Sequence, residues 1–181
     1  IGTRPVDIHL FGLKKLGAKI KIKNGYILAE AKKGLTGTKI KFPSISVGAT
    51  ENVIIAACLA NGITHLKNCA CEPEIKNLTN FLKKMGIKIT WINNREIKIV
   101  GNKSLRAVSH NVMFDRIEAG TFIIAAALAC KQIKISGLET KILKSELKYL
   151  KKMGVKMKIG KNDIKVLKSL NIKPVSIKTE P

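Results

Sequence analysis

The sequence has few of the features that mark membrane and nucleic-acid-binding proteins: long apolar runs, aromatic residues and arginine. Its most apolar stretch, residues 53–60, is far shorter than the roughly 18 residues that a membrane helix needs, so we expect no membrane partner. Aromatic residues make up 4% of the chain, and only four of its 34 basic residues are Arg. Base stacking and phosphate recognition favour these scarce residue types, which argues against a nucleic-acid partner.

A formal net charge of +22 nevertheless leaves nucleic-acid binding open. The charge comes mostly from lysines that are spread in ones and twos from Lys14 to Lys178. A solvated, lysine-rich surface accounts for this distribution, and we favour it. A lysine-rich nucleic-acid-binding module stays as the alternative, and a strongly salt-dependent affinity for polyanions would identify it.

The cysteines and histidines form no pattern typical of a metal site or a disulfide scaffold. Cys69 and Cys71 are two positions apart, which is not the C-x-x-C spacing of zinc and redox sites. Cys58 and Cys130 lie in apolar runs and are predicted to be small core residues. We therefore expect no metal and no disulfide framework, and the cysteine content fits a reducing cytoplasm.

One eight-residue motif occurs three times, at residues 13–20, 82–89 and 150–157, with spacings of 69 and 68. Each copy combines the end of an apolar-periodic helix, a Gly, and alternating apolar residues typical of a strand. A polar turn and a second strand follow in the later copies, at residues 96–100 and 163–167.

Upstream of the motif, residues 53–60 align with residues 122–129 at an offset of 69. Both segments are apolar nearly all round and are predicted to be buried helices, each followed by a short strand. The unit is a βαβαββ module of about 70 residues, present as the end of one copy, a whole second copy and most of a third. The sequence thus predicts an α/β fold with helices inside and sheets outside.

The polar stretch at residues 101–111 interrupts the repeat and predicts a domain boundary near Met113. Residues 1–112 are then the later part of one βαβαββ-repeat domain, and residues 113–181 are a partial second domain of the same architecture.

Two segments have features of an anion site. Pro5 fixes the backbone beside Arg4, so the guanidinium is presented from a stiff turn. Asp7 fits either a ligand site or a helix cap. Residues 44–50 place two hydroxyls and a Gly at a helix start, which is typical of an anion site and equally of an ordinary N-cap.

Two further segments open helices with charged residues. Residues 72–74, Glu-Pro-Glu, favour a helix start, with a catalytic carboxylate as the weaker alternative. Residues 115–121 place Asp115, Arg116 and Glu118 before an apolar helix, which indicates either a structural ion pair or a ligand site.

These motifs occur together in the order and at the spacing found in the UDP-N-acetylglucosamine 1-carboxyvinyltransferases, a family of enolpyruvyl transferases. The chain resembles that family over its whole length, through Arg-Pro-Val-Asp at residues 4–7, Ser-Val-Gly-Ala-Thr at 46–50, Glu-Pro-Glu-Ile at 72–75 and Asp-Arg-Ile-Glu-x-Gly-Thr at 115–121. The sister enzyme, 3-phosphoshikimate 1-carboxyvinyltransferase, shares the fold and is the alternative within this group.

The resemblance implies an inside-out α/β barrel, also called an inverse α/β prism, with two domains of three βαβαββ units. It implies transfer of the enolpyruvyl group of phosphoenolpyruvate to the 3-hydroxyl of UDP-N-acetylglucosamine, the first committed step of peptidoglycan synthesis. It implies no cofactor, and its partners are these two substrates.

The resemblance also implies the site residues. Arg4 lies near the phosphates and the reacting centre and is the predicted catalytic residue, while Arg116 and Glu118 face the cleft from the other domain. Cys71 stands where the family commonly has Arg. The predicted substrate-binding residues are Arg4, Pro5, Val6, Asp7, Ile8, Ser44, Ile45, Ser46, Val47, Gly48 and Arg116.

The family's chains are more than twice as long as this one. Their reactive loop cysteine precedes the position of Ile1, and their general-base Asp and a carboxylate-binding Arg follow that of Pro181. We therefore expect this fragment to be inactive by itself.

Overall fold

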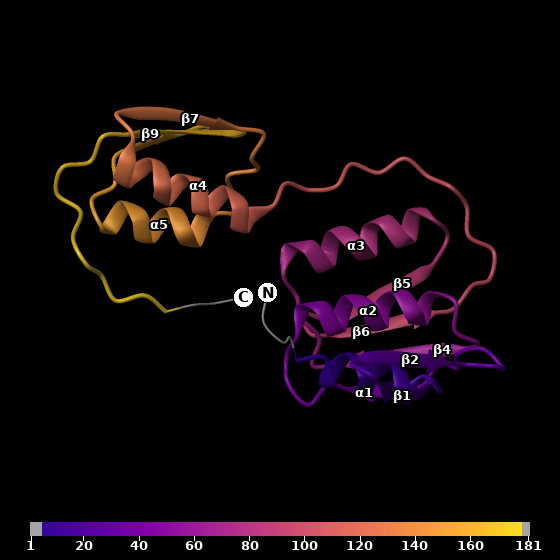
Figure 1. Ribbon diagram of the computed structural model, residues 1–181. Helices are drawn as coiled ribbons and strands as arrows, with labels where there is room; N and C mark the ends of the chain where they lie inside the picture. Colours follow the sequence, from indigo (N-terminus) through magenta and orange to yellow (C-terminus); the bar gives the residue numbers. More distant parts are fainter. Residues whose placement is uncertain (1–4, 179–181) are drawn as a thin grey trace. The chain divides into compact units, whose positions relative to one another are not determined.

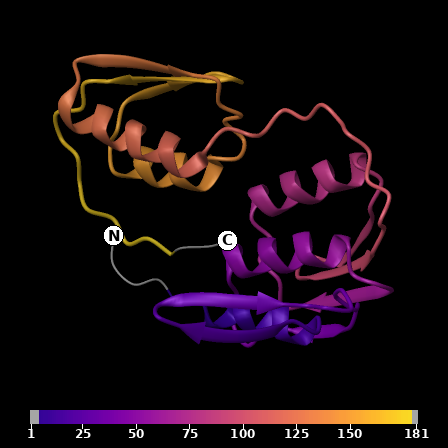
Figure 2. The same cartoon turned by 45° about the vertical axis from the view of Figure 1, so that its right-hand side comes forward.

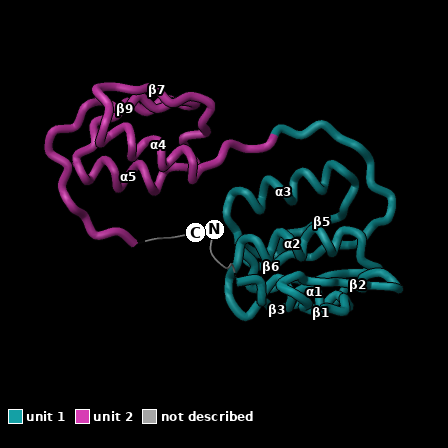
Figure 3. The backbone as a smooth tube through the Cα atoms, in the orientation of Figure 1, with its two compact units in different colours: residues 1–111, 181 teal, residues 112–180 magenta. Residues whose placement is uncertain are grey.

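The computed structural model describes residues 5–178, which fall into two units divided between Asn111 and Val112 (Figures 1 and 3). Each unit has its own hydrophobic core. The assignment of the two units to different domains of a longer enzyme stays a prediction.

Unit 1 contains two sheets and three helices. β1 and β2 form an antiparallel hairpin. The second sheet has the order β3-β4-β6-β5, in which only β3 and β4 are parallel. In chain order the elements are α1 (Asp7–Lys15), β1 (Lys19–Lys23), β2 (Tyr26–Glu30), β3 (Lys39–Lys41), α2 (Val47–Cys58), β4 (Ile63–Lys67), α3 (Pro73–Lys84), β5 (Lys88–Asn93) and β6 (Glu96–Val100).

Unit 2 repeats part of this arrangement, with both helices on one side of an antiparallel sheet (Figure 1). Its sheet has the order β7-β9-β8, which matches β4-β6-β5 of unit 1 strand for strand. The predicted repeat is therefore present in the sheet topology. In chain order the elements are α4 (Arg116–Ala129), β7 (Gln132–Ser136), α5 (Lys144–Lys152), β8 (Met157–Ile159) and β9 (Asp163–Leu167).

The repeated motif folds in the same way three times. Gly17, Gly86 and Gly154 all have positive φ, between 94° and 105°. In each copy the Gly N–H and the following N–H donate to carbonyls of the last helical turn, as Gly86 does to Lys83 and Ile87 to Leu82. This is the Schellman helix end, which favours Gly because a side chain strains the left-handed conformation.

Helix α2 is the centre of unit 1, where it packs against α1, α3 and strand β6 (Figure 2). Val53, Ile54 and Ala57 are fully buried on it. Strands β3, β4 and β6 supply the facing residues Ile40, Leu66 and Ile97 in turn. The core thus holds the start of α2 in a fixed position relative to α1.

The prediction that α2 and α4 are buried all round is wrong on one face of each. Ile55 is 52% exposed on α2, and its repeat equivalent Ile124 is 49% exposed on α4. One turn further on, Leu59 is 53% exposed and its equivalent Leu128 is 73% exposed. Within each unit, the same apolar stripe is therefore exposed, because no segment of its own unit packs against it.

We expect the four cysteines to react in two classes. Burial raises the pKa of Cys58 to about 11, and burial with the nearby Glu96 carboxylate raises that of Cys69 to about 12. Cys71 and Cys130 are partly exposed. Because the thiolate is the nucleophile, iodoacetamide at pH 8 should label Cys71 and Cys130 first. Peptide mass spectrometry would measure this, and equal labelling of all four in the folded chain would contradict it.

Candidate functional site

The start of helix α2 is capped by Ser46, as one of the two sequence interpretations proposed. The Ala49 N–H donates to Ser46 Oγ at 3.3 Å, and Thr50 Oγ1 donates to the Ser46 carbonyl at 2.7 Å. Thr50 Oγ1 also accepts from the Ala70 N–H at 3.1 Å, which ties the helix start to the loop before α3. The N-cap role is confirmed, and the anion-binding role of this segment stays a prediction.

Two backbone donors remain at this helix start. The N–H groups of Val47 and Gly48 precede the first intrahelical bond, from Thr50 to Ser46, and have no partner within residues 5–178. They lie at the positive end of the helix dipole, where anions are stabilised. Of the other predicted residues here, Ser44 and Ile45 are exposed.

The first predicted segment leads directly into α1. Arg4 lies outside the described residues. Asp7 does not cap the helix: the N-cap position is Val6, with no side-chain hydrogen bond, and Asp7 follows as an exposed first-turn residue. The cap interpretation of Asp7 is therefore wrong, although its charge still suits the helix N-terminus. Pro5 is exposed, and Ile8 packs against the core of unit 1.

Helix α1 brings its first turn next to the start of α2. His9 Nδ1 lies 2.5 Å from Asn52 Nδ2, and the His9 ring covers Gly48. The sequence analysis assigns no role to His9 and does not find this contact. It joins residues 43 positions apart, so no local pattern could have found it.

Acidic groups surround this edge of unit 1. Burial raises the pKa of Glu51 on α2, the nearby Glu74 on α3 raises it further, and His9 lowers it. Glu72 accepts a hydrogen bond from the Cys71 N–H at 2.7 Å, and Pro73 begins α3. The segment at residues 72–74 is therefore a helix start, as expected.

In unit 2, the charged segment at residues 115–118 is largely structural. Asp115 is the N-cap of α4 and accepts from the N–H groups of Ile117 and Glu118 at 2.8 and 3.0 Å. Arg116 Nη1 lies 3.9 Å from Glu146 Oε1 on α5. These contacts favour the structural interpretation of this segment, and a ligand role for Arg116 stays a prediction.

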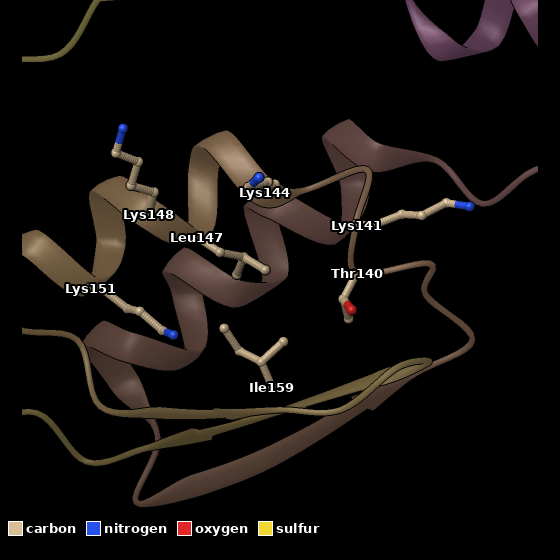
Figure 4. Close-up of a pocket in the computed structure, with 7 residues that line it drawn as sticks. All are labelled: Thr140, Lys141, Lys144, Leu147, Lys148, Lys151 and Ile159. Carbon is tan, nitrogen blue, oxygen red and sulfur yellow. The ribbon is translucent and has the colours of Figure 1, made fainter.

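Two hollows lie on the surface of the part of the chain that the structure describes. One, of about 490 Å³, lies between α5, the loop before it and β8 of unit 2 (Figure 4). Lys151 points into it beside Leu147 and Ile159, whereas Lys148 points away (Figure 4). A second, on the outer face of the four-stranded sheet, is lined in part by His65. Neither contains a residue that the resemblance predicts for the site.

Lysines form rows across the outer faces of both larger sheets. Lys134, Lys165 and Lys158 are paired in register across β7, β9 and β8. The matching row of unit 1 includes Lys39, His65 and Lys98. Like charges directly opposite one another are unfavourable, so the three lysines of unit 2 repel one another. Carboxylates offset part of the charge in both rows: Lys134 Nζ lies 3.2 Å from Asp163 Oδ2, and His65 Nε2 lies 2.6 Å from Glu96 Oε1.

Two structural tests concern metal and membrane. Within residues 5–178, no group of three His, Cys, Asp or Glu side chains is arranged to hold a metal ion. In the same part of the chain, no helix has the length and apolar content to cross a bilayer.

A family model described as EPSP synthase (3-phosphoshikimate 1-carboxyvinyltransferase) matches residues 1–181, the whole chain. The chain belongs to this family. Its fold agrees: the chain is similar to the enolpyruvyl transferase NikO from Streptomyces tendae, with a TM-score of 0.79 and 20% identity, over 93% of this chain and 43% of that one. An EPSP synthase from Acinetobacter baumannii gives a TM-score of 0.68 and 20% identity, over 97% and 42%. The predicted α/β fold of this enzyme group is thereby confirmed.

Curated relatives within the family are more similar in sequence. The UDP-N-acetylglucosamine 1-carboxyvinyltransferase of Pelagibacter ubique is 56% identical over the whole chain, and enzyme 1 of that name from Clostridium acetobutylicum is 48% identical. In both cases this chain spans 43% of the relative's length. The predicted resemblance to a segment of these transferases is confirmed.

Proposed function

We propose that this chain is a segment of an enolpyruvyl transferase that acts on UDP-N-acetylglucosamine and phosphoenolpyruvate in the cytoplasm, at the first committed step of peptidoglycan synthesis. The observation that carries the proposal is the 56% identity, over all 181 residues, with a protein named UDP-N-acetylglucosamine 1-carboxyvinyltransferase. The four motifs at residues 4–7, 46–50, 72–75 and 115–121 support it. The free thiols of the four cysteines fit a reducing compartment.

The proposed chemistry is addition followed by elimination. The sugar 3-hydroxyl loses its proton as its oxygen bonds to C2 of phosphoenolpyruvate, and C3 takes up a proton to give a tetrahedral intermediate. A proton then leaves C3 as the C2–O bond to phosphate breaks, which releases inorganic phosphate. Because both substrates are anionic, positioned donors and cations are the main contribution that the protein makes.

In this proposal the chain supplies part of the nucleotide-sugar site. The free N–H groups of Val47 and Gly48 hold the diphosphate at the start of α2, and Ser46 fixes that start by capping it. Residues 5–8 line the nucleotide. Arg4 binds the phosphates beside the reacting centre, and Arg116 supports the cleft.

The sister reaction on 3-phosphoshikimate is the second candidate, since the family model carries that name. Sequence identity of 20% with solved enzymes of that branch supports the fold alone. The relatives of higher identity are named for the nucleotide sugar, so we favour UDP-N-acetylglucosamine.

The test is a chimera in which residues 1–181 replace the matching segment of the Pelagibacter ubique transferase. It should release phosphate from phosphoenolpyruvate when UDP-N-acetylglucosamine is present, and not when 3-phosphoshikimate is. The 181-residue chain alone is the matched negative control. Turnover of 3-phosphoshikimate, or none of the nucleotide sugar by a folded chimera, would overturn the proposal.

Arg4→Lys in the chimera should lower kcat/KM for UDP-N-acetylglucosamine by at least about tenfold, because Lys keeps the charge but cannot bind two phosphate oxygens at once. Steady-state phosphate release measures this. Arg106→Lys is the matched control, since Arg106 Nε donates to the Lys84 carbonyl away from the site. Equal activity of the two variants would contradict the role of Arg4.

A further inference from the structure

The two units differ in what lies between the amphipathic helix of the repeat and the strand that follows it. In unit 1, Trp91 of β5 lies there, and its Nε1–H donates to Thr79 Oγ1 on α3 at 3.2 Å. Lys76 Nζ lies over the indole ring, 3.0 Å from its centroid. An aromatic ring, a hydroxyl acceptor and a cation therefore occupy this place together.

The strand pairing identifies Ile159 as the unit 2 equivalent of Trp91. On β5, Trp91 pairs with Ile97 of β6. On β8, Ile159 pairs in the same way with Ile164 of β9. Directly paired residues point to the same face of a sheet, and Ile97 and Ile164 are both 0% exposed. Trp91 and Ile159 therefore both point toward the core of their own unit, and the smaller Ile side chain leaves space that the indole fills in unit 1.

The helix positions correspond as well. Counted back from the Gly that ends each helix, Leu147 on α5 takes the place of Thr79. By the same count Lys144 takes the place of Lys76. Unit 2 thus keeps the cation and lacks both the ring and the hydroxyl acceptor. What remains is the hollow of about 490 Å³ between α5 and β8 (Figure 4), a volume within the roughly 300–1,000 Å³ of small-ligand sites.

This hollow combines an apolar surface with unpaired ammonium groups. Leu147 contributes apolar surface, and Lys151 points into the hollow beside it (Figure 4). Lys141, which also lines the hollow, forms an ion pair with Glu139. No carboxylate within residues 5–178 pairs with Lys144 or Lys151, so both are available to an anionic ligand.

We propose that this hollow binds a planar aromatic carboxylate, whose ring takes the place that Trp91 fills in unit 1. Lys144 lies over the face of the ring, as Lys76 does over the indole, and Lys151 donates to the carboxylate. Because Leu147 offers no acceptor, the ring needs no N–H group, which favours an all-carbon ring over an indole. None of the residues that line the hollow belongs to the site predicted for the nucleotide sugar.

The probe is 1-naphthylacetate, titrated into the 181-residue chain at millimolar concentrations and physiological salt, with binding followed by backbone amide NMR shifts. The largest shifts should lie in α5 and β8. Two matched ligands separate ring and charge: 1-naphthylacetamide has the same ring without the charge, and cyclohexylacetate has the charge without an aromatic ring. Both should bind at least about threefold more weakly. Absence of binding, largest shifts on the exposed stripes of α2 or α4, or equal affinity for cyclohexylacetate would overturn the proposal.

Substitutions of the lysines test each contact. Lys151→Gln should weaken binding of naphthylacetate by about fivefold and leave naphthylacetamide unchanged, because it removes only the partner of the carboxylate. Lys144→Gln should weaken both ligands by at least about threefold, because it acts on the ring. Lys148→Gln is the matched control and should change neither, since Lys148 points away from the hollow (Figure 4). Equal effects of Lys151→Gln and Lys148→Gln would contradict the assignment of the carboxylate contact.

Ile159→Trp places the unit 1 residue in unit 2 and should fill the hollow with a ring of the protein itself. Naphthylacetate should then bind more than about tenfold more weakly. Ile133→Trp on β7 is the matched control: Ile133 has the same 37% exposure as Ile159 and does not line the hollow. Circular dichroism checks that both variants are folded. A folded Ile159→Trp variant that binds naphthylacetate as well as Ile133→Trp does would overturn the inference.

Discussion

Gly101→Ala is expected to lower the free energy of unfolding of unit 1 by about 3 kcal/mol. A Cβ at this position would lie 1.8 Å from the Ala60 carbonyl oxygen and 2.9 Å from its carbon, both backbone atoms. The backbone cannot move aside cheaply, because the Gly101 N–H donates to the Gly62 carbonyl and the Asn102 N–H to the Cys58 carbonyl. Urea unfolding followed by the fluorescence of Trp91, the single Trp of the chain, measures the change.

The control for this prediction is Lys103→Ala, an exposed position two residues further on. It should change the free energy of unfolding by less than about 0.5 kcal/mol. A Gly101→Ala variant as stable as the Lys103→Ala variant would show that the end of β6 is not held against α2 as described.

Leu143→Ala is expected to destabilise unit 2 by about 2–5 kcal/mol. Leu143 is 0% exposed, at the N-cap of α5, and belongs to a small core in which ten of the described residues are buried. Truncation removes buried apolar surface and leaves a cavity in a core with few other contacts to compensate. Hydrogen exchange of peptides from α4 and β9, read by mass spectrometry, should accelerate.

Leu170→Ala provides the same chemical change at a position that is 76% exposed, and it should leave that exchange unchanged. If both Leu variants exchanged alike, the small core around Leu143 would not be what stabilises unit 2.

The repeat was the most predictable part of the fold. Helix, Gly and strand recur at a constant period, and each of the three depends on residues that are close in sequence. Gly86 and Gly154 end their helices as expected, and strands β6 and β9 have the predicted bounds. These features are local, so composition and periodicity are enough to find them.

The exposed stripe on α2 and α4 was not predictable in the same way. Apolar residues all round a helix indicate full burial only if every face has a neighbour. Ile55 and Ile124 have the apolar character of core residues, but no segment of their own unit covers them. Local sequence shows that a helix face is apolar and favours burial. Whether that face is buried depends on the tertiary packing.

The candidate site was predictable only where backbone geometry forms it. Ser46 caps α2 because a hydroxyl before a helix is a strong local signal. Asp7 has the same kind of signal, yet Val6 takes the N-cap position, Asp7 is the first helical residue, and no side-chain cap bond forms. The contact between His9 and Asn52 depends on how α1 packs on α2, which no short-range pattern encodes.

The exposed apolar stripes and the lysine charge lead us to expect that self-association of the isolated chain depends on the salt concentration. At low ionic strength the net charge of +22 keeps molecules apart. Salt shortens the range of that repulsion from about 10 Å at 0.1 M to about 3 Å at 1 M. Ile55, Leu59, Ile124 and Leu128 can then meet their counterparts on other molecules. We therefore expect the isolated chain to stay dispersed at low salt and to self-associate as the salt concentration is raised.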